Sequence, residues 1–307
     1  MEITTNADGS VTITTTDTTI TIAGVGAAIA SATASSGLTL SPDYIGPANP
    51  PAPPTLPLVF SDDFSSGGLA TVGPSGACWA GVNLSPGGGS NVSTSDGATG
   101  GSIVASTNGL AFTYPAQPQG GQCLVEQDGY LGAPMSKGVR IQFGLAVPIN
   151  YIHRGGGSQY PSGTPSSNNK FLAIYRNPNT PGQLVSDWNM TWNTTLCTWP
   201  TPTGGSSLSL SLYDNDVEQP IIPFAPNFIT SADLGKTMQV SCCVVLPSSA
   251  GNDGQFWFFK NGELLFYKND CANPIAALTS FYLLGACNSG FTSQTALTIS
   301  DVQVFAQ

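Results

Sequence analysis

The segment from residue 151 to residue 176 concentrates side chains that could take a proton from a sugar acid and neutralise its carboxylate. These side chains belong to Tyr151, His153, Arg154, Tyr160, Lys170, Tyr175 and Arg176. Elimination from a polyuronate needs a cation or hydrogen-bond donor for the carboxylate and a Tyr, His or Lys that removes the C5 proton. However, residues 154–169 are rich in Gly, Ser, Pro and Asn, a composition typical of a long surface loop. We expect a non-catalytic polar groove here, with a lyase site as the alternative.

Large aromatic side chains usually pack in a core, and this is the expectation for Trp79, Trp188, Trp192 and Trp257. Trp199 precedes Pro200 and is expected in an exposed loop, where its ring could stack on a sugar. The residues expected to bind carbohydrate are therefore Tyr151, His153, Arg154, Tyr160, Lys170, Arg176 and Trp199. No residue is assigned a catalytic role.

Two acidic groups have the spacing of functional carboxylates. Glycosidases use a pair of carboxylates on one face of a strand, and Glu126 and Asp128 have the required alternate positions, but Gly129 follows and a third acid is missing. Asp214, Asp216 and Glu218 also alternate, close to Pro220. We expect both groups to be solvated loops. The alternative for the second group is a Ca²⁺ site, because calcium prefers such oxygen ligands.

Seven cysteines leave at least one thiol unpaired within the chain. Cys242 and Cys243 are adjacent in a strand-like run, so their side chains should point to opposite faces. Burial as small apolar residues is one interpretation. One or two disulfides are the other, with Cys271–Cys287 as the candidate pair.

Alternation of apolar and polar residues with frequent turn residues predicts an all-β chain. The strands expected in the second half include Met238–Leu246, Gln255–Phe259 and Glu263–Tyr267. Asn261-Gly262 predicts a two-residue turn between the last two, because both residues tolerate positive φ.

In that hairpin we expect Phe256, Phe258, Leu264 and Phe266 to share one face, and Lys260 to be exposed. Further strands are expected at 102–105, 110–114, 139–147, 170–175, 184–192 and 208–213.

The C-terminal pattern resembles concanavalin A-like jelly rolls, the branch shared by polysaccharide lyases, laminarinase-like domains and lectins. The resemblance rests on Asp253-Gly-Gln-Phe256, Asn261-Gly-Glu263 and the final Ile299-Ser-Asp-Val-Gln-Val304, with Val59–Phe64 as the opening strand. It spans roughly Leu58 to Gln307. It implies a sandwich of two antiparallel sheets, and the motifs that carry it are structural.

Composition divides the chain into three parts. Residues 1–45 are rich in Thr, Ala and Gly, and a β-hairpin is expected on both sides of Thr16-Asp17. Residues 46–57 form a proline-rich linker that favours an extended conformation. Residues 58–307 form the jelly-roll domain. An arm of this size cannot build a core of its own, and its strand edges invite pairing with another chain.

Charge is low and unevenly placed. The net charge is −10, and all eight basic residues lie after position 136. This distribution disfavours nucleic acid as a partner. The start of the chain shows no signal-peptide pattern, and nothing in the sequence predicts membrane insertion.

These features together suggest a non-enzymatic structural protein of a bacteriophage, a capsid decoration protein or head fibre that forms homo-oligomers. Residues 1–45 would contact capsid or other virion subunits, after assembly in the host cytoplasm. The jelly roll would be displayed on the virion surface, where a host glycan is a candidate ligand. The alternative is a tail-associated receptor-binding protein or a polysaccharide depolymerase.

Overall fold

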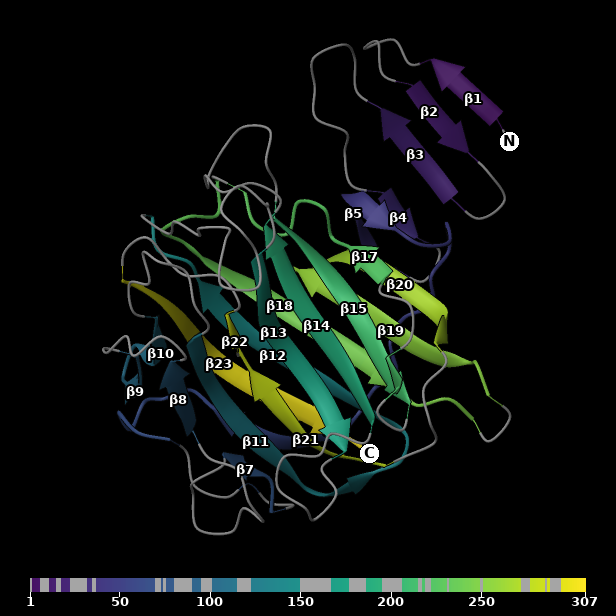
Figure 1. Ribbon diagram of the computed structural model, residues 1–307. Helices are drawn as coiled ribbons and strands as arrows, with labels where there is room; N and C mark the ends of the chain where they lie inside the picture. The colour runs from purple at the N-terminus through teal and green to yellow at the C-terminus, as the bar shows by residue number, and fades with distance from the viewer. Residues whose placement is uncertain are drawn as a thin grey trace.

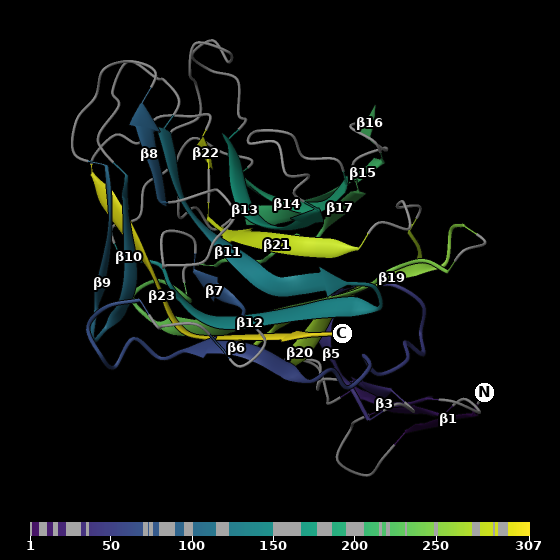
Figure 2. The same ribbon diagram turned by 90° about the horizontal axis from the view of Figure 1, so that it is seen from below.

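The protein folds as a sandwich of two β-sheets that enclose its core, with antiparallel pairing among the described strands except at one pair (Figures 1 and 2). A computed structural model describes the following residues: 2–5, 11–14, 18–22, 32–34, 37–69, 73, 76–79, 90–94, 101–114, 123–149, 167–176, 186–194, 206–214, 217–218, 222–230, 232–248, 251–271, 277–284, 286–287 and 294–307. The regular elements in these residues are all strands. The same residues contain no helix that is long and apolar enough to cross a membrane.

The first sheet has 13 strands and contains both ends of the described chain. Its order is β1 (Glu2–Thr5), β2 (Val11–Thr14), β3 (Thr18–Ile22), β4 (Ala32–Ala34), β5 (Thr39–Ile45), β20 (Glu263–Cys271), β19 (Gly254–Lys260), β18 (Thr237–Val245), β12 (Gly138–Ala146), β23 (Thr295–Ala306), β10 (Gly109–Tyr114) and β9 (Ser102–Ser106), with β6 (Leu58–Asp62) paired to β23.

The second sheet has 10 strands and covers the other side of the core. Its order is β16 (Val217–Glu218), β15 (Ser206–Asp214), β14 (Ser186–Thr194), β13 (Ser167–Arg176), β21 (Leu278–Leu283), β11 (Cys123–Met135) and β22 (Ala286–Cys287), with β17 (Ile222–Phe224) paired to β15, and β7 (Cys78–Trp79) and β8 (Ser90–Thr94) paired to β11. The short β22 also pairs with β13.

The core forms where the inward-facing positions of the two sheets meet. Strand β23 shows the pattern most clearly, because buried and less buried residues alternate along most of its length. Trp188 of the ten-stranded sheet stacks on Phe256 of the other sheet, with ring centroids 6.2 Å apart. Trp79 and Trp257 are also buried. The expected burial of the tryptophans is confirmed for these three, whereas the side chain of Trp192 lies outside the described residues.

The Asn261-Gly262 turn is confirmed. Both residues have positive φ, 51° and 84°, and Lys260 pairs directly with Glu263. The turn docks on β18, since the backbone N–H of Asn261 donates to the carbonyl of Gln239 at 2.8 Å.

Two details of this hairpin differ from expectation. The register shifts between Phe258 and Phe259, and this irregularity puts Leu264 opposite Phe259, in the apolar cluster on the outer face rather than in the core with Phe258. Lys260 is not exposed, because its Nζ donates to Asp233 Oδ2 at 2.7 Å and only 14% of its side chain is accessible.

The proline-rich segment lies on the outer face of the 13-stranded sheet. Leu40 and Leu56 are buried there in a cluster that includes Trp257 and Tyr267. The Trp257 indole N–H donates to the carbonyl of Pro51 at 2.8 Å. The proline-rich segment is therefore attached to the sandwich at Pro51 and Leu56.

The N-terminal strands continue the 13-stranded sheet beyond the sandwich. Strand β5 pairs in parallel with β20, and β4, β3, β2 and β1 follow outward from it (Figure 2). The hairpin expected around Thr16-Asp17 is confirmed by the pairing of β2 with β3, in which Thr14 is opposite Thr19.

Strand β11 was not anticipated as a strand. The sequence around Glu126 and Asp128 was expected to form a solvated loop, but it lies within this 13-residue strand, next to β21 in the ten-stranded sheet. Gly129 suggests a turn, yet it is needed here because a Cβ at this position would overlap the ring of Phe281. Gly132 has a φ of 83° in the irregular part of the same strand.

Candidate functional site

The outward face of the ten-stranded sheet gathers polar side chains from neighbouring strands. On β13, Leu172 and Ile174 point into the core, so the alternate residues Ala173 and Tyr175 belong to the opposite face. On β21, Tyr282 belongs to that same face and is in contact with Tyr175. We call this surface the polar face.

The register aligns the positions of the polar face into rows that cross five strands. One row consists of Tyr213, Asp187, Tyr175, Ser280 and Tyr130. The next row consists of Ser211, Asn189, Ala173, Tyr282 and Asp128. Because directly opposite residues of antiparallel strands share a face, the register assigns these tyrosine, acid, amide and hydroxyl positions to one face.

A β-bulge in β13 decides which residues join this face. The pairing with β14 shifts between Lys170 and Leu172, so that Phe171 and Leu172 both enter the core. Lys170 thereby takes a position opposite Thr191, in line with Ala173 on the polar face. The bulge is held from the neighbouring strand by Leu284, whose N–H donates to the Phe171 carbonyl at 2.8 Å and whose φ is 54°.

The side chains described on the polar face differ in accessibility. Tyr175 and Tyr282 are buried, with ring centroids 6.0 Å apart and an interplanar angle of 48°. Tyr130 and Asp128 are half-buried on β11. Asp128 is further fixed through its backbone carbonyl, which accepts from Gln127 Nε2 at 3.0 Å. The half-buried groups are thus the Tyr130 phenol and the Asp128 carboxylate, whose Oδ1 atom is itself buried, and both are kinds of group that hydrogen-bond to sugar hydroxyls.

The structure brings two of the expected carbohydrate-binding residues onto one strand. Lys170 and Arg176 both lie on β13, Lys170 at a polar-face position and Arg176 exposed at the end of the strand, opposite Ser186. The other expected residues lie outside the described part of the chain and stay predictions. They are Tyr151, His153, Arg154, Tyr160 and Trp199.

The expected calcium ligands lie around β15 and β16. Asp214 is opposite Val217, and Glu218 is opposite Tyr213, so the register assigns Asp214 and Glu218 to opposite faces of the pair. Asp216 lies outside the described residues, and a calcium site here stays a prediction. Within the residues described, no three His, Cys, Asp or Glu side chains are grouped to hold a metal.

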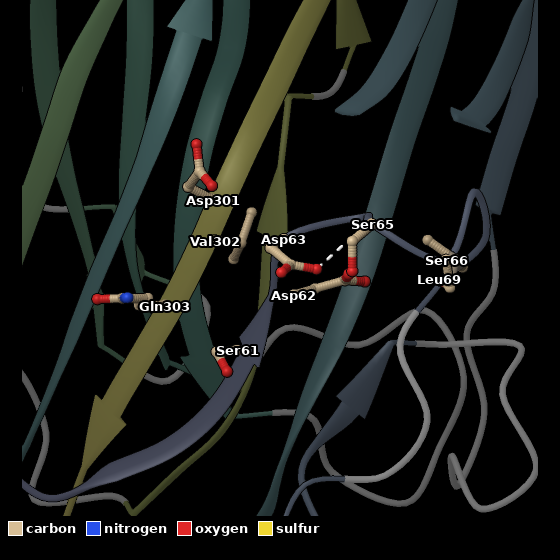
Figure 3. A pocket seen from close by; sticks show the side chains of 9 residues that line it. All are labelled: Ser61, Asp62, Asp63, Ser65, Ser66, Leu69, Asp301, Val302 and Gln303. Carbon is tan, nitrogen blue, oxygen red and sulfur yellow. Dashed lines mark hydrogen bonds between the residues drawn. The ribbon is translucent and has the colours of Figure 1, made fainter. Parts of the chain in front are cut away.

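A separate depression of about 520 Å³ lies at the end of β6 beside β23 (Figure 3). Its acidic residues are Asp62, Asp63 and Asp301. The buried Asp62 carboxylate accepts from Trp79 Nε1 at 2.7 Å and from the Phe64 N–H at 2.8 Å. Asp63 accepts from the Ser65 N–H at 2.9 Å, and hydrogen bonding from this serine lowers the pKa of Asp63. These two carboxylates therefore organise a turn.

Of the polar-face tyrosines, Tyr175 belongs to the 151–176 group expected from the sequence, whereas Tyr130, Tyr213 and Tyr282 were not anticipated, because each lies on a different strand. Within β11 the sequence did contain a usable signal. Glu126, Asp128 and Tyr130 alternate, which is the spacing of one strand face.

Comparison with known proteins finds similarity at the level of structure. No family model matches the chain, and no curated protein matches its sequence. An endo-β-1,4-glucuronan lyase from the fungus Trichoderma reesei is 14% identical, with 81% of this chain and 95% of that chain covered and a TM-score of 0.49. The alginate lyase vAL-1 from Chlorella virus is 12% identical, with 72% and 95% covered and a TM-score of 0.44.

A carbohydrate recognition domain, that of Emp46p, is also similar in structure. It is 11% identical, with 67% of this chain and 86% of that chain covered and a TM-score of 0.40. At such identities the likeness concerns the fold.

One expectation is corrected by this comparison. The sequence analysis assigned no enzymatic activity, but the structures of similar fold include the glucuronan and alginate lyases. The expectation that the chain is not an enzyme is therefore contradicted. The expected all-β fold is confirmed: the described strands form two packed sheets, as in a jelly-roll sandwich.

Proposed function

We propose that the chain binds a polysaccharide containing uronic acid along the polar face and cleaves it by β-elimination. The observation that carries the proposal is the alignment, across adjacent strands, of tyrosine positions with amides, hydroxyls and Lys170. The lyases of similar fold described above are named for glucuronan and alginate.

The dimensions of the polar face suit an extended chain of sugars. Neighbouring strands lie about 4.8 Å apart, so five strands span roughly 19 Å across the sheet. A site of that width can span several sugar rings in succession, and Tyr130 and Asp128 are its half-buried side chains.

The charge of the protein makes Lys170 the cation to test. The chain carries a net charge of −10 and only eight basic residues. Lys260 and Lys268 are already ion-paired, with Asp233 and Asp270. Lys170 occupies a position on the polar face and is suited to neutralising a uronate carboxylate, which acidifies the C5 proton.

Tyr130 is assigned the proton transfer, because it is the half-buried tyrosine described on this face. In the elimination the C5–H electron pair becomes the C4–C5 double bond and the C4–O bond breaks. The ionised Tyr130 phenolate takes the C5 proton, and the phenol so formed returns a proton to the departing sugar oxygen as the C4–O bond breaks. The product is an unsaturated uronate.

The test measures binding and cleavage separately on a panel of polyuronates and neutral glucans. Binding is measured by calorimetry, and cleavage by the ultraviolet absorbance of the unsaturated product. Tyr130→Phe should abolish cleavage and retain binding, and Lys170→Met should weaken both on uronates. Tyr44→Phe, on the opposite side of the sandwich, is the control and should behave as wild type.

Absence of binding to every polymer of the panel would reject the proposal. Binding of wild type without product would reject the elimination and leave a carbohydrate-binding domain. His153→Ala tests the site expected from the sequence, and loss of cleavage in that variant alone would move the base from Tyr130 to His153.

The arm favours a second role, attachment to a larger assembly. Strands β1 to β4 pair only with one another and with β5 among the described elements, and they extend away from the sandwich (Figures 1 and 2). Attachment to virion subunits, of a bacteriophage head or tail, stays a prediction.

The assembly role is tested by deleting residues 1–36, which spares Leu40 and its packing on the sandwich. The truncated protein should melt at the same temperature as wild type and should no longer join the particle or oligomer. Unchanged incorporation of the truncated protein would exclude anchoring by the arm.

A further inference from the structure

Cys123 and Cys287 occupy directly opposite positions of two paired strands. Cys123 is the first residue of β11, Cys287 is the last residue of β22, and the two strands are antiparallel with these residues as register partners. The neighbouring partners Leu124 and Ala286 confirm the same register.

Such a position has the geometry of a disulfide. Directly opposite residues of antiparallel strands have Cα atoms about 4.5 or 5.5 Å apart, depending on whether the pair is hydrogen-bonded. A disulfide requires a Cα separation of roughly 4.4–6.8 Å. Both kinds of cross-strand pair fall within that range, so the bond needs no movement of the backbone.

None of the other cysteines described has a cysteine as its register partner. Cys78 is opposite Tyr130, Cys242 is opposite Phe258, Cys243 is opposite Trp257, and Cys271 is opposite Gly254. All four are buried free thiols. Burial raises the pKa of Cys243 and of Cys271 to about 12, which suppresses the reactive thiolate. The pair Cys271–Cys287 expected from the sequence is wrong, because Cys271 is a free thiol of the 13-stranded sheet.

The location gives the bond a structural reason. Strand β22 has only two residues and follows the interruption of β21 at Leu284, where φ is positive. It lies between β11 and β13, adjacent to the β13 segment that contains Lys170 (Figure 2). So short a strand is held by few hydrogen bonds, and a covalent link to β11 would fix it.

We propose that Cys123 and Cys287 form a cross-strand disulfide that fixes β22 to β11 beside the polar face. The bond forms by exchange with a small disulfide such as oxidised glutathione. One thiolate attacks the small disulfide and releases one reduced thiol, and the second thiolate then attacks the mixed disulfide and releases another. The two cysteines lose two protons and two electrons, and the small disulfide gains them.

The experiment is a peptide map of the full-length protein after incubation with oxidised glutathione. Free thiols are alkylated under denaturing conditions without reductant, and the protein is digested and analysed by mass spectrometry. We expect one cross-linked species that joins the Cys123 and Cys287 peptides, and alkylation of Cys78, Cys242, Cys243 and Cys271. Alkylation of both Cys123 and Cys287, or a link from either of them to another cysteine such as Cys197, would overturn the proposal.

Melting supplies a second readout. Reduction should lower the melting temperature of the oxidised protein by roughly 3–8 °C, as the loss of a typical disulfide implies for a chain of this size. Cys287→Ser should melt at the lower temperature with and without reductant. The double variant Cys123→Ser/Cys287→Ser should melt at the same temperature as each single variant. A wild-type melting temperature that is insensitive to reduction would contradict the structural role.

Discussion

Replacement of Asp62 by alanine should destabilise the sandwich strongly, because this buried carboxylate satisfies two buried donors. It accepts from the Trp79 indole at 2.7 Å and from the Phe64 N–H at 2.8 Å. Phe64 and Trp79 are fully buried, and Phe64 has a φ of 58°, a conformation that a bulky residue rarely adopts without support.

The magnitude follows from those two bonds. Each buried donor left without its acceptor costs about 1–3 kcal/mol, and bonds to a charged group lie in the upper part of that range. We expect Asp62→Ala to lower the free energy of unfolding by about 3–5 kcal/mol. For a chain of 307 residues the melting temperature should then fall by roughly 5–8 °C. Asp62→Asn keeps one acceptor and should lose about half as much.

Differential scanning calorimetry measures the effect, with Asp63→Ala as the matched neighbour. Asp63 is exposed and caps only the Ser65 N–H, so its loss should shift the melting temperature by less than about 2 °C. Equal melting temperatures for Asp62→Ala and wild type would refute the reasoning, since the two donors would then not depend on this carboxylate.

Three further predictions concern packing, backbone and charge. Gly129→Ala should cost about 1–3 kcal/mol in chemical denaturation, because its Cβ would overlap the Phe281 ring; an unchanged midpoint would mean that the ring can move aside. Gly262→Val should cost about 1–3 kcal/mol in the same assay, because φ is 84° there, although the position has open space around it. Burial by itself raises the pKa of Asp233, but hydrogen bonds from Lys260 and the backbone outweigh burial, so the pKa is lowered from 3.8. Because the pKa of Asp233 is lower in the folded than in the unfolded protein, its ionised form stabilises the fold. This stabilisation is complete above the pKa of the unfolded state and is lost as the pH falls through the pKa of the folded state. The melting temperature of Asp233→Asn should therefore differ from that of wild type above the ordinary carboxyl pKa of 3.8 and converge on it as the pH falls through the lowered pKa, and a constant difference would contradict the ion-pair assignment.

Local sequence determined much of the sheet structure. Alternation alone located most strands of the 13-stranded sheet, because a strand with one buried face requires apolar residues at every second position. The Asn261-Gly262 turn was also determined locally, since few residue pairs tolerate positive φ at both positions. The hairpin of β2 and β3 follows from the same two signals.

Tertiary structure alone decided the composition of the polar face. Tyr130, Tyr175 and Tyr213 are separated by many residues in the sequence. Their positions fall in one row only through pairings with the strands between them. The bulge at Phe171 cannot be inferred from alternation, because it reverses which face later residues occupy. Strand β11 shows the same limit: its glycines indicate turns locally, but the Phe281 ring packed against Gly129 makes a residue without a side chain necessary there. Cys123 and Cys287 likewise meet only because two distant segments share one register, which no local pattern encodes.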